Sequence, residues 1–128
     1  FDERLSNIGG SDQLFFKKLF LKGHEIRWNK NYPVIEKFQK KRNTFSWFLK
    51  RNYRYASSSV LIDRYSFGVF RGLILSLFKM GFYFIFFLLN LFVLIFNPKK
   101  NFLKSIKNLV RAFSIFLSLL GLFPKSYV

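Results

Sequence analysis

The chain has 128 residues, with 22 Lys and Arg against 6 Asp and Glu and a formal net charge of +16. It has no cysteine and a single histidine, His24, which excludes disulfides, thiolate metal sites and any site that needs two histidines from this chain. The 20 phenylalanines gather in continuous apolar runs rather than on a basic polar face. This pattern favours anionic lipid as the partner of the positive charge, so we expect no nucleic-acid binding.

Charge divides the chain into two parts. Residues 1–67 hold all 6 acidic residues and 14 of the basic ones, whereas residues 68–128 hold 8 basic residues and no acid. We therefore expect two regions with these bounds. The first residue is Phe1, and the only methionine, Met80, lies deep in an apolar run. On this basis we expect the chain to be a fragment of a longer protein.

A first helix is expected from about Asp12 to Lys22. Ser11 can cap its N-terminus, after the turn signal of two consecutive glycines, and Gly23 is placed to end it. Helical spacing puts Leu14 on an apolar face and Lys17 on the solvent face. The first region is thus predicted to begin with a short amphipathic helix.

Two short extended pieces are expected after this helix, at residues 25–28 and 33–38. Thr44 then opens a second helix that reaches about Tyr65, and the serine run at 57–59 is a candidate interruption of it. The exposed face of this helix carries three basic residues, Lys50, Arg51 and Arg54. Together these elements predict a mixed helix and strand region.

The second region contains the candidate membrane segments. Residues 80–96 are uncharged, and extension back to residue 73 gives a span at about 73–96, enough to cross a hydrocarbon core of ~30 Å. A shorter apolar helix is expected at about 106–123, after a basic amphipathic stretch. It is a re-entrant or interfacial helix, or a short second span whose basic residues snorkel. Buried helices of soluble proteins are also apolar all round, but only residues 1–67 remain to cover these two.

Several phrases of the sequence resemble family 2 glycosyltransferases of the GT-A fold. The first phrase is Phe1-Asp2-Glu3, then Gly9-Gly10-Ser11-Asp12, then Gly23-His24-Glu25-Ile26. The second is similar to a phrase of a membrane-associated bacterial subgroup: Val34-Ile35-Glu36, Arg42, Trp47-Phe48-Leu49 and Lys50-Arg51-Asn52-Tyr53-Arg54. The resemblance implies an α/β fold for residues 1–67, as the C-terminal, acceptor-side part of a nucleotide-diphospho-sugar transferase domain. Residues 68–128 would follow as mostly α-helical membrane segments.

The resemblance also implies roles for single residues. Asp12 would be the general base that takes the proton from an acceptor hydroxyl, with Gly9, Gly10 and Ser11 at the acceptor. The family usually has Glu where this chain has Ser11, which leaves the choice of acceptor open. Arg51 and Arg54 would contact the acceptor or a pyrophosphate, and a guanidinium fork suits phosphate oxygens. From the residues alone, Asp12 is equally a helix N-terminal charge, and the arginines are equally a solvated or headgroup-facing surface.

The function that the resemblance implies is transfer of a sugar, with inversion at its anomeric carbon, from a nucleotide-sugar donor to a membrane-proximal sugar or lipid-linked acceptor. The enzyme would be held on membrane lipids, and a helical hairpin dipping into one leaflet places the catalytic part on the cytoplasmic face. The resemblance implies a divalent metal, Mg²⁺ or Mn²⁺, for the full-length enzyme, with the donor site and metal ligands upstream of Phe1. The alternative is a small, non-enzymatic basic membrane protein that acts as an anchor or interaction module.

Overall fold

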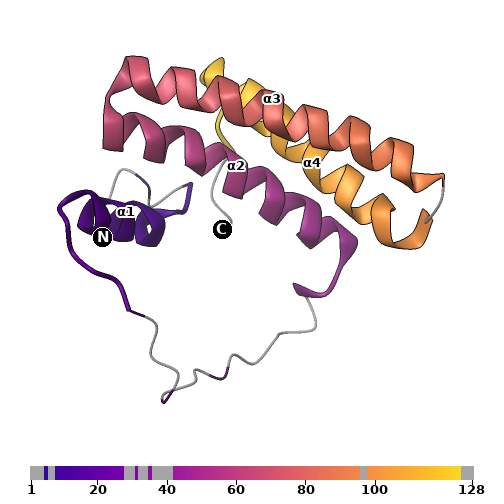
Figure 1. The fold of residues 1–128 in the computed structure, drawn as a ribbon, viewed down its shortest axis with the longest axis horizontal. Coiled ribbons are helices and arrows are strands. Elements are labelled where there is room, and N and C mark those ends of the chain that lie inside the picture. Colours follow the sequence, from indigo (N-terminus) through magenta and orange to yellow (C-terminus); the bar gives the residue numbers. More distant parts are fainter. Residues whose placement is uncertain are drawn as a thin grey trace.

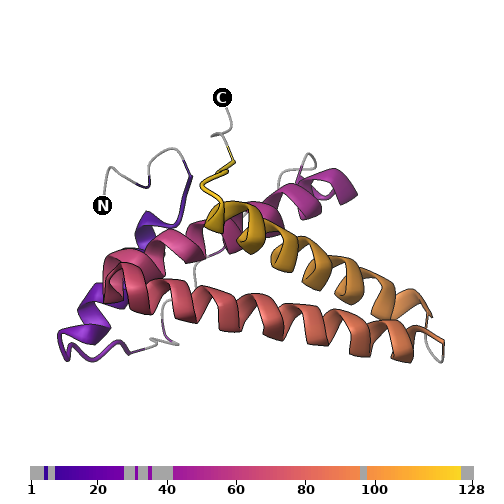
Figure 2. The same cartoon turned by 90° about the horizontal axis from the view of Figure 1, so that it is seen from above.

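Four helices form the regular structure of the computed structural model, which describes residues 5, 8–27, 31, 35, 42–95 and 98–124. They are α1 (Ser11–Leu21), α2 (Phe45–Phe67), α3 (Val69–Leu94) and α4 (Pro98–Leu119). Helices α2, α3 and α4 pack as a bundle in which α3 and α4 run side by side, and α1 lies against α2 (Figure 1). Figure 2 places α1 at the end of the bundle where α2 turns into α3.

The prediction of an α/β fold is wrong for the described residues, which contain helices and no strand. The first expected extended piece has no regular structure over its residues 25–27, while Trp28 and most of the second piece, at 33–38, lie outside the described residues. The physical reason is that a strand is stable only when its backbone groups pair with a neighbouring strand. Short extended pieces have no such partner in the described part of the chain, whereas a helix satisfies its own backbone.

Helix α1 begins one residue earlier than predicted. Gly10 takes the N-cap position with a φ of 91°, and no side chain caps the helix, so the prediction that Ser11 is the cap is wrong. The predicted stop is confirmed: Gly23 has a φ of 82°, and the N–H of His24 donates across it to the carbonyl of Leu19 at 3.1 Å. Glycine adopts this left-handed backbone without steric cost, which closes the helix end.

Helix α2 runs without interruption from its predicted cap to a glycine turn. The hydroxyl of Thr44 accepts a hydrogen bond from the N–H of Trp47 at 3.2 Å, as the sequence predicts. The serine run at 57–59 does not break the helix, and two of its hydroxyls donate to carbonyls one turn earlier. At Gly68 a φ of 84° lets the chain turn directly into α3, so one residue separates two long helices.

Helix α3 is, among the described residues, the one helix long and apolar enough to cross a membrane. Its 26 residues would extend about 39 Å at 1.5 Å per residue, against a hydrocarbon core of about 30 Å. It begins four residues before the expected span at 73–96 and ends two before it. The second expected helix, at 106–123, is α4, which begins eight residues earlier because the basic stretch before the apolar run is itself helical.

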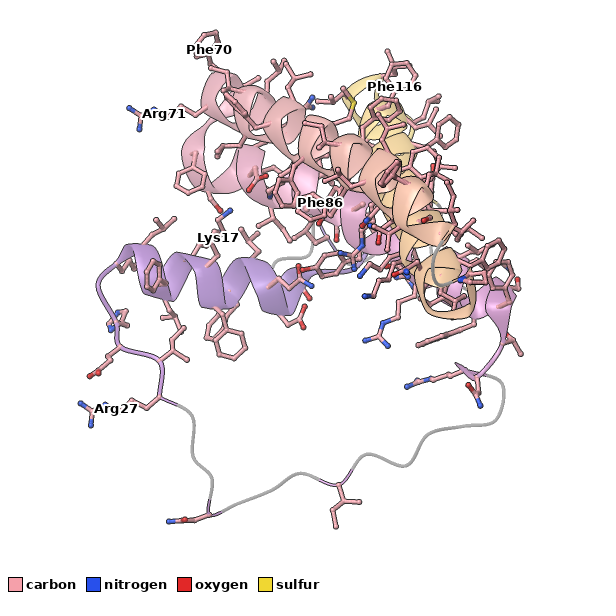
Figure 3. The ribbon with its side chains drawn as sticks, turned by 45° about the vertical axis from the view of Figure 1, so that its right-hand side comes forward. Lys17, Arg27, Phe70, Arg71, Phe86 and Phe116 are labelled. Atoms are coloured by element: carbon pink, nitrogen blue, oxygen red, sulfur yellow. The ribbon has the colours of Figure 1, made fainter. Side chains whose placement is uncertain are left out.

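The interior of the bundle combines small and polar side chains with an apolar cluster around Val60 and Ile115, and its exterior carries large apolar side chains. Large apolar side chains project outward from α3 and α4, including Phe70 at 77 % exposure and Phe116 at 48 % (Figure 3). The inner face of α4 buries Asn101, Ser105, Asn108, Ala112, Ser114, Ile115 and Ser118. In water-soluble proteins the large apolar side chains are the buried ones. Small residues between helices and apolar residues outside are the arrangement that helices adopt in lipid.

Hydrogen bonds hold the polar interior together. The hydroxyls of Ser57 on α2 and Ser118 on α4 contact each other, and Ser114 donates to the backbone carbonyl of Tyr53 at 2.5 Å. The guanidinium of Arg111, on α4, donates to the amide oxygen of Asn52 at 2.9 Å. These bonds satisfy side chains that would otherwise be buried without partners, and they fix the register of α4 on α2.

The contact between α2 and α3 depends on a glycine. A Cβ added at Gly72 would lie 2.7 Å from the Cα of Arg64 and 2.8 Å from its backbone nitrogen. We therefore expect Gly72→Ala to force the helices apart and to lower the free energy of unfolding by about 1–3 kcal/mol. The measurement is denaturant unfolding of the protein in detergent micelles.

The matched control for this substitution is Gly81→Ala on the same helix. A Cβ added there meets nothing within 4 Å. Alanine is the better helix former by about 1 kcal/mol, so Gly81→Ala should be neutral or stabilising. Equal unfolding curves for the two variants would contradict the close packing of α2 on α3.

Candidate functional site

A pocket lies between the start of α1 and the N-terminal half of α2. Its volume is about 560 Å³, within the range of small-molecule sites. The residues around it come from the loop before α1, from α1 itself, and from the segment leading into α2 and that helix: Ile8, Gly9, Gly10, Gln13, Arg42, Trp47, Arg51, Arg54, Tyr55 and Ser58. Parts of the chain more than thirty residues apart in sequence therefore meet in one site.

The two glycines of the loop let its backbone approach α2 closely. Gly9 has a φ of 87°, and a Cβ added there would lie 3.1 Å from the Nη2 atom of Arg54. A Cβ added at Gly10 would lie 3.1 Å from side-chain atoms of both Ser58 and Ile62. Any larger residue would have to adopt a strained backbone and displace these neighbours. The glycine pair is thus a steric requirement of the pocket.

The pocket is strongly basic. Three guanidinium groups line it, those of Arg42, Arg51 and Arg54, and no carboxylate is among the described residues that line it. The Nη2 of Arg54 donates to the backbone carbonyl of Ile8 at 3.3 Å, which ties the loop to α2. The guanidinium carbon of Arg51 lies 5.0 Å from the centre of the Trp47 ring, a cation–π arrangement that holds this side chain over the ring. Such a site suits phosphate or carboxylate anions.

The N-terminus of α1 adds to the positive potential of the pocket. Gly10 is the N-cap of that helix and lines the pocket, as does Gln13 in its first turn. The first backbone N–H groups of a helix have no partner within it and carry a partial positive charge. The arginines and the N-terminus of α1 therefore both favour a negatively charged ligand.

The predicted site residues divide into two groups. Gly9, Gly10, Arg51 and Arg54 line the pocket together. Ser11 and Asp12 do not line it, although they occupy the first turn of α1 between two residues that do. The carboxylate of Asp12 is exposed to solvent beside the pocket. A general base at this position would act at the edge of the pocket, on a ligand that extends out of it.

A buried carboxylate holds α1 in place against the bundle. Asp63 on α2 is 1 % exposed and contacts the Nζ of Lys17 at 2.6 Å and that of Lys79, on α3, at 2.5 Å. Figure 3 shows Lys17 pointing from α1 toward the bundle, not to solvent as its helical position predicts. Beside this ion cluster, Leu5 and Leu14 pack against Ile62 in a small apolar core. These contacts fix the position of the loop and of Asp12 relative to the pocket.

Sequence reasoning missed several residues of the pocket. Trp47 belongs to the second phrase of the resemblance but is given no role by it, and Gln13, Tyr55 and Ser58 are given none either. The sequence does contain a signal for Trp47, Tyr55 and Ser58, because helical spacing puts them on the same face as Arg51 and Arg54. The contribution of Gln13 depends on how α1 docks on α2, which the sequence pattern does not specify.

The described residues contain no group of three or more His, Cys, Asp or Glu side chains that could hold a metal ion. His24 lies just after α1, exposed, in a segment without regular structure. No protein-family model, curated protein or solved structure matches this chain.

Proposed function

We propose that this chain is the acceptor-side, membrane-attached part of a glycosyltransferase that moves a sugar from a nucleotide-sugar donor to an acceptor at the bilayer surface. One observation carries the proposal. Gly9 and Gly10 of the first phrase that resembles such enzymes line the same pocket as Arg51 and Arg54 of the second phrase, although at least forty residues of chain separate the glycines from the arginines. Residues from both phrases of the resemblance thus converge on a site whose charge suits phosphate.

In the proposed reaction, an acceptor hydroxyl attacks the anomeric carbon of the donor sugar. A new bond forms between the acceptor oxygen and that carbon, and the bond from the carbon to the diphosphate oxygen breaks. The hydroxyl proton passes to the carboxylate of Asp12, and the nucleoside diphosphate leaves with the electron pair of the broken bond. A carboxylate in the first turn of a helix is held in a fixed direction, which assists this transfer. The charge of the arginines would stabilise phosphate groups of the acceptor or leaving group.

Membrane attachment is supported by the distribution of side chains over the bundle. Large apolar residues cover the outside of α3, and those on α4 are Phe102, Leu103, Leu109, Phe113 and Phe116. An exposed apolar surface of this extent is typical of contact with lipid or another protein. The serine and asparagine side chains of the interior favour lipid, because helices that associate in lipid use such residues to pack and to hydrogen-bond.

The alternative function is a non-enzymatic basic membrane anchor or interaction module. The apolar exterior and the net charge support both functions equally. The pocket favours sugar transfer, because an anchor has no need for two glycines with left-handed backbones that close a loop onto the arginines of α2.

The experiment that separates the two uses the natural protein in its own membranes and a panel of nucleotide sugars labelled in the sugar. The proposed function predicts that label from at least one donor becomes bound to a lipid or saccharide acceptor. The control is the same membranes without the protein. Membranes that contain the protein and transfer no more label than the control would favour the anchor.

A further inference from the structure

The side chain of Arg111 joins the middle of α3 to α2 and α4. Its guanidinium donates from Nη1 to the hydroxyl of Tyr83 at 3.4 Å and from Nε to the amide oxygen of Asn52 at 2.9 Å. Tyr83 lies near the middle of α3, whose ends are Val69 and Leu94. The middle of α3, the first half of α2 and the middle of α4 therefore lie at the same level of the bundle.

Basic side chains gather at this level. On α2, Arg51 and Arg54 of the basic pocket lie within one helical turn of Asn52, and on α4 Lys107 precedes Arg111 by one turn. If α3 crossed a bilayer from end to end, its middle would lie at the bilayer centre, and these cations and the pocket would lie at that depth with it. Charged groups are costly there. A crossing orientation of α3 therefore conflicts with the packing of α2 and α4 on it.

The side chains of α3 divide into an inner row and an outer apolar face. The inner row lies at helical spacing and consists of Gly72, Ser76, Lys79 and Tyr83. Ala56 and Val60 of α2 pack in one apolar cluster with Tyr83, and helical spacing puts the pocket residues of α2 on the other face of that helix. The outer face of α3 carries large exposed apolar side chains, among them Phe70, Phe78 and Phe92 (Figure 3). The apolar face and the basic pocket are thus on opposite sides of the bundle.

We propose that α3 does not cross the bilayer but lies parallel to its surface, with the outer faces of α3 and α4 immersed in the acyl chains of one leaflet. The basic pocket and α1 then lie on the aqueous side. This orientation places the apolar outside of both helices in lipid along their whole length and keeps the cations of the pocket out of the hydrocarbon. Arg71 also projects outward from α3, but it lies in the first turn, where a long side chain can reach the headgroups (Figure 3).

The charge of the chain favours lipid over a second copy as the occupant of the apolar face. Two copies that each carry a net charge of +16 would repel each other. An anionic bilayer surface complements both sides of the bundle, because its acyl chains contact the apolar face while its phosphates attract the basic residues.

The orientation can be measured with nitroxide labels on single cysteines, since the chain has no cysteine of its own. Positions 70, 81 and 92 follow one another at intervals of about three helical turns, so they share one face of α3. Phe70 and Phe92 are exposed, and a Cβ added at Gly81 meets nothing within 4 Å. Phe70→Cys, Gly81→Cys and Phe92→Cys are each labelled in vesicles of phosphatidylcholine and phosphatidylglycerol. Depth is obtained from collisions of the nitroxide with oxygen, which concentrates in lipid, and with a water-soluble nickel chelate.

We expect the three labels to lie in the hydrocarbon at the same depth to within about 5 Å, the radius of a helix with its side chains. A crossing helix would instead place the label at position 81 about 16 Å deeper than the other two, at 1.5 Å per residue, and this profile would overturn the proposal. Collision of all three labels mainly with the chelate would contradict contact with lipid. Protection of all three from both reagents would indicate a protein on this face and would also contradict the proposal.

Two further variants complete the measurement. Lys22→Cys, exposed at the end of α1, serves as the reference for the aqueous side, and we expect its label to collide mainly with the chelate. A label at Lys22 that lies in lipid would contradict the proposed orientation. Ile85→Cys, also exposed on α3, replaces Gly81→Cys as the middle position if the latter lowers the helical content measured by circular dichroism.

The labelling is independent of catalysis, because no sugar donor is present. Equal depths in a protein that transfers no sugar would support the orientation and contradict the proposed function. A crossing profile in a protein that transfers sugar would leave the proposed function standing and overturn the orientation.

Discussion

Replacement of Asp12 by Asn is expected to slow sugar transfer by about 100- to 10,000-fold, the range that a positioned general base contributes. Asparagine keeps the size and much of the polarity of the side chain but takes up no proton at neutral pH. Asp12 is exposed in the first turn of α1 and does not contribute to the buried core, so the fold should be unaffected. The measurement is the initial rate at which the labelled sugar is transferred by membranes containing the Asp12→Asn protein, compared with membranes containing the unsubstituted protein.

The matched control for this substitution is Glu25→Gln. Glu25 is an exposed acid just beyond the other end of α1, where it pairs with Arg27 at 2.8 Å in full contact with solvent. Exposed pairs of this kind contribute about 0–1 kcal/mol, and Glu25 is remote from the pocket lining, so its loss should leave the rate unchanged. A near-normal rate for Asp12→Asn would remove Asp12 from the role of base.

The second large effect is expected at Asp63. Asp63→Asn would leave the ammonium groups of Lys17 and Lys79 facing each other across a buried amide. Loss of one partner of a buried ion cluster costs about 3–5 kcal/mol, and the lower end applies here because both lysines keep partial access to solvent. Since Lys17 links α1 to the bundle through Asp63, α1 should detach before the bundle unfolds. Hydrogen exchange in α1 should accelerate by about 100-fold while that of α4 changes little.

A rescue variant distinguishes loss of the ion cluster from a general loss of packing. If all three residues become apolar, as in Lys17→Met with Asp63→Leu and Lys79→Met, no buried charge remains without a partner. The triple variant should restore slow exchange in α1. Fast exchange in α1 of the triple variant, or slow exchange in Asp63→Asn, would contradict the role of Asp63 in docking α1.

Local signals in the sequence predict the helices well. Thr44 caps α2 and Gly23 ends α1 as expected, because a cap or a left-handed glycine depends on a few neighbouring residues. The apolar run of α3 is visible without any knowledge of the fold. The expected strands are not found among the described residues, because alternation over four to six residues is a weak signal and a strand depends on a distant partner.

The site itself is only partly predictable from sequence. The resemblance names Gly9, Gly10, Arg51 and Arg54, and the structure brings these four together. The role of Asp63 carries no sequence signal, because a single acid in a basic segment is not distinguishable from a surface residue. Its burial follows from the docking of three helices around it, and that docking depends on small residues such as Gly72 whose importance is steric.

The most direct test of the proposed site compares two arginine substitutions in the label-transfer assay. Arg51 lines the pocket and is stacked on Trp47, whereas Arg71 projects outward from α3, away from the pocket (Figure 3). Loss of a charge-assisted hydrogen bond costs about 1.5–3 kcal/mol, so Arg51→Gln should lower the rate of sugar transfer about 10- to 100-fold. Arg71→Gln should transfer at the rate of the unsubstituted protein. Equal rates for Arg51→Gln and Arg71→Gln would contradict the assignment of sugar transfer to this pocket.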